Sequence, residues 1–191
     1  MSEPLLNHLS KFVALPAEDQ AGILAFFRPK HCKKKENLLE AGKLCKSHYF
    51  IAKGCLRLFF INEKGVEHTT HFAIENWWLT DYLAFQNGQP TGFYIQAVED
   101  TQVLALDWHA QERLLAQYPY LERYFRLVYQ RANGAAQLRI RYLYEFSREE
   151  IYSHFSTHFP EFVQRIPQYL LASFLGFTPE YLSEIRRKKR S

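Results

Sequence analysis

The chain has 191 residues, of which 47% are hydrophobic, and a formal net charge of +4. This composition excludes disorder of the whole chain, and no apolar run reaches the roughly 18 residues of a membrane-spanning helix. The amino terminus lacks the basic and apolar layout of a secretory signal. Three cysteines leave an odd thiol, so they imply no disulfide framework. We therefore expect a cytoplasmic protein with no membrane partner.

The positive charge is concentrated at the carboxyl end of the sequence. Residues 1–164 hold 18 basic and 18 acidic side chains, whereas residues 165–191 hold six basic and two acidic ones. Five of those basic residues are consecutive, at positions 186–190. An asymmetry of this kind indicates an anionic partner for the last stretch of the chain.

The first two thirds of the sequence change from a helical to a β pattern. Apolar side chains recur at helical spacing in residues 5–13 and in a second segment that starts at Pro16 and is expected to end at Pro29. From residue 31 to residue 107, short apolar or alternating runs are divided by glycines and charged turns, as in a β-sandwich or barrel. Residues 62–65, Asn-Glu-Lys-Gly, predict a hairpin turn.

A long helix is predicted after the β region. Asp107 is a candidate N-cap for a short helix ending near Gln117, and Pro119 suits the first turn of a helix that runs to about Phe146. Apolar positions form a seam along this helix, at Leu121, Phe125, Val128, Ala132, Ala135, Tyr142 and Phe146. Small residues in its middle would let an identical helix approach, so the seam pairs with its own copy. The alternative is that it packs only on its own β domain.

The last 45 residues predict a helix-turn-helix. Ser147 and Glu150 form a capping box for a helix that Pro160 is expected to end. After a short connection come two helices, at about 167–175 and 179–189. Gly176 between them can take the left-handed conformation that ends a helix. The turn is about three residues long, the spacing of a motif whose second helix enters the DNA major groove.

The second of these helices carries the candidate DNA contacts. After Tyr181 its apolar residues are chiefly Leu182 and Ile185. Its outward face is polar, and its end is basic. A charge run that closes a helix-turn-helix predicts phosphate binding. The candidates for base contact are Thr178, Glu180, Tyr181, Ser183 and Glu184, and those for phosphate contact are Arg186, Arg187, Lys188 and Lys189.

The order of β-rich domain, long helix and helix-turn-helix resembles the CRP/FNR family of bacterial transcription factors. The resemblance rests on residues 38–42 (LLEAG), 49–57 (YFIAKGCLR) and 96–100 (QAVED) of the β domain and covers essentially the whole chain. It implies an α+β fold: a cyclic-nucleotide-binding-like β-roll (jelly roll) with flanking helices at 1–117, a dimerisation helix at 118–146, and a helix-turn-helix domain at 147–191. It also implies a homodimer on double-stranded DNA, with RNA polymerase and a small-molecule effector as further partners.

Two departures from the family pattern change what the resemblance implies. In the stretch comparable to the phosphate cassette, Asp81 stands in for a Glu and Thr91 occupies the place of an Arg, and no Lys or Arg lies between Lys64 and Arg113. A cyclic phosphate would lack a charged partner, so we expect no cyclic-AMP response and no cofactor. The pocket candidates are Thr80, Asp81, Thr91 and Gly92. The second departure is that Ser191 leaves no room for the usual β-hairpin wing, which leads us to expect a helix-turn-helix without one.

Other kinds of site are weakly supported. His68 and His71 would point to opposite faces of a strand, so they cannot share a metal ion. Glu150, His154 and His158 share a helical face, but such sets are usually solvated. No phosphate-binding loop, dinucleotide fingerprint or zinc-protease motif is present, so we expect neither a resident metal nor an enzyme. The alternative to a regulator is a ligand-binding or protein-interaction module with a degenerate helix-turn-helix that does not recognise specific DNA.

Overall fold

The computed structural model describes residues 2–188 and divides into two compact units. The first unit contains the chain up to Phe60 together with Thr70–Gln130, and the second contains Ile61–Thr69 together with the chain from Arg131 onward. Among residues 2–188, no helix has both the length and the apolar character needed to cross a bilayer.

The first unit is a β-roll with helices on one side. Its helices are α1 (Ser2–Ser10), α2 (Ala17–Leu24), α3 (Tyr82–Asn87), α4 (Trp108–Gln117) and the start of α5 (Leu121–Glu145). The strands are β1 (Arg28–Cys32), β2 (Asn37–Leu39), β3 (Ser47–Lys53), β4 (Leu56–Ile61), β5 (Glu67–Ala73), β6 (Trp78–Leu79), β7 (Tyr94–Ala97) and β8 (Thr101–Asp107). They form two four-stranded sheets, ordered β1-β8-β3-β6 and β2-β7-β4-β5.

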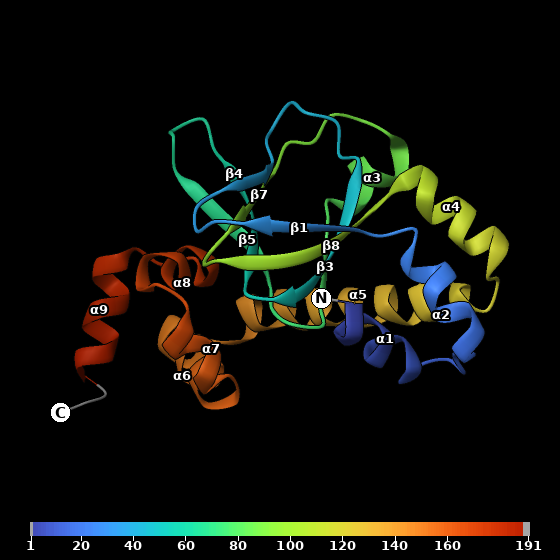
Figure 1. Ribbon diagram of the computed structural model, residues 1–191. Helices are drawn as coiled ribbons and strands as arrows, with labels where there is room; N and C mark the ends of the chain where they lie inside the picture. The colour runs from blue at the N-terminus through green and yellow to red at the C-terminus, as the bar shows by residue number, and fades with distance from the viewer. Residues whose placement is uncertain (1, 189–191) are drawn as a thin grey trace. The chain divides into compact units, whose positions relative to one another are not determined.

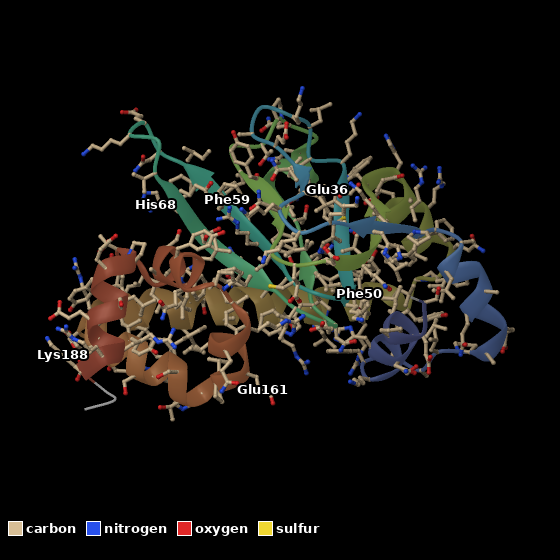
Figure 2. All side chains as sticks on the ribbon, turned by 60° about the vertical axis from the view of Figure 1, so that its left-hand side comes forward. Glu36, Phe50, Phe59, His68, Glu161 and Lys188 are labelled. Atoms are coloured by element: carbon tan, nitrogen blue, oxygen red, sulfur yellow. The ribbon has the colours of Figure 1, made fainter. Side chains whose placement is uncertain are left out.

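Side-chain alternation along β3 separates two hydrophobic cores. Tyr49 and Ile51 point into a core between the two sheets, together with Leu56 and Ile95. Phe50 points the other way, into a core that β3 and β8 share with α1, α2, α4 and the first turns of α5. Figures 1 and 2 show the helices that enclose this second core, and Figure 2 labels Phe50. The predicted α+β fold with a β-roll is confirmed.

The predicted end of the second helix at Pro29 is wrong. The second helix ends at Leu24, and Pro29 lies inside β1. β1 is an edge strand, where a proline without an amide hydrogen is tolerated. The helix α3 was not predicted at all. Asp81 caps its first turn by accepting from the Ala84 amide at 3.2 Å, and Gly88 ends it with φ 62°.

The second unit is helical apart from a β-hairpin tip. Its helices are the rest of α5, α6 (Arg148–His158), α7 (Pro160–Arg165), α8 (Gln168–Leu175) and α9 (Pro179–Lys188). The predicted capping box is confirmed, since Ser147 and Glu150 exchange both hydrogen bonds. The connection expected after Pro160 is wrong, because Pro160 occupies the first turn of α7. The hairpin turn at 62–65 is confirmed, with Gly65 at φ 76°.

Candidate nucleic-acid interface

The helix-turn-helix is closed by the residues that the sequence singled out. Gly176 adopts φ 79° and ψ 29°, and the Phe177 amide donates back to the Ala172 carbonyl at 2.8 Å. This left-handed turn satisfies carbonyls that would otherwise be left at the end of α8. The Thr178 hydroxyl accepts from the Tyr181 amide at 3.2 Å and so caps α9.

One face of α9 is buried against the rest of the second unit. Leu182 is fully buried and Ile185 is 4% exposed, and Leu171 and Ala172 of α8 are fully buried as well. The small Ala172 allows the two helices to approach closely. Because these apolar positions fix the rotation of α9 about its axis, the opposite face is presented to solvent.

The exposed face of α9 carries charges of both signs. Glu180, Ser183, Glu184 and Arg187 are exposed and recur at helical spacing. Lys188, at the end of the helix, pairs with Glu184 at 3.1 Å (Figure 2). The charge of Lys188 is therefore neutralised locally by Glu184.

Three other candidates have partners within the second unit. Thr178 is exposed, and its hydroxyl is used in the helix cap. The Tyr181 hydroxyl donates to Glu149 of α6 at 2.6 Å, and this bond lowers the pKa of Glu149 and raises that of Tyr181. The guanidinium of Arg186 lies against the side-chain amide of Gln168, whose oxygen accepts from Nε at 3.1 Å when the amide is turned over. The ninth candidate, Lys189, lies outside the described residues.

Arg139 of α5 makes contacts with α8 that sequence patterns did not predict. Its Nη2 donates to the Phe174 carbonyl of α8 at 2.6 Å, and its guanidinium lies 4.1 Å from the centre of the Phe174 ring. Burial lowers the pKa of Arg139 to about 10, so the side chain stays charged at neutral pH. The one available signal was that Arg139 interrupts the apolar seam of α5. The cation lies where carbonyls at the end of α8 carry partial negative charge.

Two of the four predicted pocket residues of the β-roll, Asp81 and Thr91, are joined by a hydrogen bond. The Thr91 hydroxyl donates to Oδ2 of Asp81 at 2.6 Å, while Oδ1 of Asp81 caps α3. Thr80 is buried and donates to the Ser47 carbonyl at 2.9 Å. Gly92 follows Thr91 and is exposed. Both carboxylate oxygens of Asp81 are thus occupied by donors of the chain itself, and the cluster carries negative charge.

Arg57 is a buried arginine of the β-roll, but its side chain lies on the outer face of its sheet and not in the core between the two sheets. It is 3% exposed, and its Nε and Nη2 donate to Gln96 at 3.0 and 2.7 Å. Its neighbours Leu56 and Leu58 point into the core between the sheets. Alternation along β4 therefore places Arg57 on the outer face of its sheet, away from the core into which Leu56 and Leu58 point.

Metal chemistry gains no support from the geometry. Within the described range, 2–188, no three His, Cys, Asp or Glu side chains converge as metal ligands would. Cys32, Cys45 and Cys55 are buried and are not joined in disulfides. Burial raises the thiol pKa of both Cys32 and Cys45, which disfavours the reactive thiolate.

Comparison with known proteins agrees with this architecture. The model of the family called cyclic nucleotide-binding domain matches residues 29–118. Those residues are therefore similar to a cyclic nucleotide-binding domain. No curated protein matches the chain. The matched stretch contains the Asp81–Thr91 pair.

Solved structures extend the likeness beyond that domain. The c-di-GMP-responsive global regulator CLP of Xanthomonas campestris has a TM-score of 0.73 at 12% identity, covering 92% of each chain. A putative regulator of the CRP/FNR family from Eubacterium rectale has a TM-score of 0.70 at 14% identity, covering 92% of this chain and 84% of that one. The catabolite activator protein of Thermus thermophilus has a TM-score of 0.58 at 21% identity and the same coverage. The chain is similar to these proteins and has the CRP/FNR fold.

Proposed function

We propose that the chain is a homodimeric, cytoplasmic, DNA-binding transcription regulator of the CRP/FNR type that does not respond to cyclic AMP, and that it is not an enzyme. The observation that carries the proposal is the helix-turn-helix with a capped α9 whose outer face is exposed. A buried inner face and a polar outer face are what a helix in the major groove needs. An RNA polymerase contact and a small-molecule effector belong to the same proposal.

Within this proposal, the roles of the α9 residues follow from their exposure. Glu180, Ser183 and Glu184 face bases, and Arg187 contacts phosphate. A Glu can accept from the amino group of cytosine but cannot pair with guanine O6 and N7. Lys188 contacts phosphate only by giving up its ion pair with Glu184. The operator therefore contains cytosine on the strand that α9 contacts.

Selection of bound sequences from a random DNA pool, followed by salt titration on the selected site, tests DNA recognition. Because Arg187 contacts one phosphate, Arg187→Ala should weaken binding to all sequences and reduce the slope of log affinity against log salt by about 1. Arg28→Ala, on an exposed strand of the β-roll, is the matched control and should leave the slope unchanged. Failure to select any sequence over random duplex would contradict the regulator.

The alternative is a ligand-binding or protein-interaction module whose helix-turn-helix no longer recognises specific DNA. The acidic residues on the outer face of α9 and the Glu184–Lys188 pair favour it, because both reduce attraction to phosphate. Salt-sensitive binding with equal affinity for selected and random duplexes would establish this alternative.

The Asp81–Thr91 pair disfavours the binding of cyclic AMP. The carboxylate of Asp81 repels a cyclic phosphate, and Thr91 supplies no positive charge to offset it. Calorimetry with cyclic AMP and cyclic GMP should give no binding at concentrations up to about 1 mM. Micromolar affinity for either nucleotide would contradict the proposal, whereas binding of a ligand without a phosphate would not.

A further inference from the structure

The tip of the β4–β5 hairpin forms part of the second unit, where it bonds to α8. The Ser173 hydroxyl of α8 donates to the Glu67 carbonyl at 2.8 Å and accepts from the Thr69 amide at 2.9 Å. The Thr69 hydroxyl lies 3.3 Å from the same oxygen. Both figures show α8 beside this end of β5, and Figure 2 labels His68 between the two bonded residues.

These bonds fall on the open edge of a sheet. β5 is the last strand in the order β2-β7-β4-β5, so one of its edges has no strand to pair with. The backbone carbonyl of Glu67 and the backbone amide of Thr69 point toward the same edge of β5, because they are two residues apart in a strand. The Ser173 hydroxyl of α8 therefore donates to the Glu67 carbonyl and accepts from the Thr69 amide, as the backbone of a neighbouring strand would. Because Thr69 is 2% exposed, water does not readily replace these bonds.

The next residue of α8 is held by a different element. Arg139 of α5 donates to the Phe174 carbonyl and stacks on the Phe174 ring. Adjacent residues of α8 are thus bonded to β5 on one side and to α5 on the other. Both elements continue into the first unit, β5 from Thr70 onward and α5 over its residues up to Gln130.

We propose that Ser173 and Arg139 are positioning residues that set the orientation of the helix-turn-helix relative to the hairpin tip and to α5 within the second unit; the inference rests on the proposed DNA-binding function. The hairpin tip holds α8 in place through the Ser173 hydrogen bonds, a role called the brace below, and does not contact DNA. Its exposed charges are Glu63 and Glu67 against Lys64, which do not suit a phosphate.

The test compares two variants of nearly equal shape, Ser173→Thr and Ser173→Val. Thr keeps the hydroxyl and Val removes it. In Ser173→Val the Thr69 amide loses its acceptor, so its hydrogen exchange should rise about tenfold, while Ser173→Thr should behave as the wild type. Ser173→Ala removes the same hydroxyl with less bulk and should match Val if the added methyl groups have no effect of their own.

A second measurement follows the orientation of the motif without DNA. Spin labels at Lys64→Cys on the hairpin and Ser183→Cys on α9 report the distance between these elements, and the native cysteines are buried. The distance distribution should broaden in Ser173→Val and in Arg139→Met, and should stay narrow in Ser173→Thr. On the selected operator, affinity should fall about tenfold for Val with non-specific affinity unchanged.

Unchanged exchange at Thr69, or an unchanged distance distribution in Ser173→Val, would overturn the brace. Equal loss of operator affinity in Ser173→Thr and Ser173→Val would also overturn it, since the hydroxyl would then not be the cause. If the wild type binds no DNA, the proposed function fails, but the exchange and distance measurements still decide whether Ser173 orients α8.

Discussion

At the scale of single residues, His48 is the most unusual side chain of the β-roll. It is fully buried, and its ring centre lies 4.4 Å from that of Trp78, 5.4 Å from that of Tyr82 and 5.9 Å from that of Tyr129. Burial lowers the pKa of His48 to about 3, which the nearby Gln111 side chain only partly offsets. Burial also raises the pKa of Tyr82 and Tyr129. The ring is therefore neutral at all physiological pH values.

This pKa predicts a pH dependence of folding stability. The unfolded chain takes up a proton on His48 as the pH falls below about 6.5, and the folded chain does not until about pH 3, so stability is lost in between. The free energy of unfolding should drop by about 2 kcal/mol from this residue between pH 7 and pH 5. Urea unfolding of His48→Phe should lack this drop, while His31→Gln on exposed β1 should keep it. An unchanged pH slope in His48→Phe would contradict the assignment.

At the scale of elements, α5 shows what a hydrophobic pattern predicts and what it leaves open. The seam predicted for self-pairing is used within the chain at both ends. Leu121 and Phe125 lie in the core of the first unit, and Tyr142 and Phe146 pack against His154 of α6. Helical periodicity shows that one face of a helix is apolar, but it does not show which element or which chain packs against that face.

A different stripe of α5 is the better candidate for the dimer interface. Ile140, Leu143 and Tyr144 are 56%, 53% and 90% exposed and lie on one side of the helix. Replacing Ile140 and Leu143 by Glu should convert a dimer into a monomer, because burying two carboxylates in the interface is unfavourable. Light scattering coupled to size-exclusion chromatography measures this.

Leu138 supplies the matched control for that experiment. It is 50% exposed but lies about 200° around the helix from Ile140. Leu138→Glu should therefore remain dimeric. A monomeric Leu138→Glu alongside a dimeric Ile140→Glu/Leu143→Glu variant would place the interface on the opposite side of α5.

Helix caps were predictable because they depend on few neighbouring residues. Asp107 accepts from the Ala110 amide at 2.8 Å, as predicted for the start of α4. The cap at Ser147 is confirmed in the same way. The six-residue α3 was missed because it is too short for a periodic signal. Its start and end depend on Asp81 and Gly88.

At the scale of the whole molecule, the sequence determined the order of the parts: a β-roll, a long helix and a helix-turn-helix. Local signals suffice for this, since alternation, glycine turns and capping residues act over a few positions. The sequence also predicted that the cassette would lack a cation, because a missing Lys or Arg can be seen without knowing the fold.

Only the tertiary structure decided which side chains meet across long separations. The Thr91 hydroxyl bonds Asp81, the Tyr181 hydroxyl bonds Glu149 over 32 positions, and Ser173 bonds residues more than 100 positions away. It also showed that Lys188 of the basic run forms an ion pair with Glu184 on α9. These pairings arise from the packing of strands and helices against one another, and neither composition nor periodicity records that geometry.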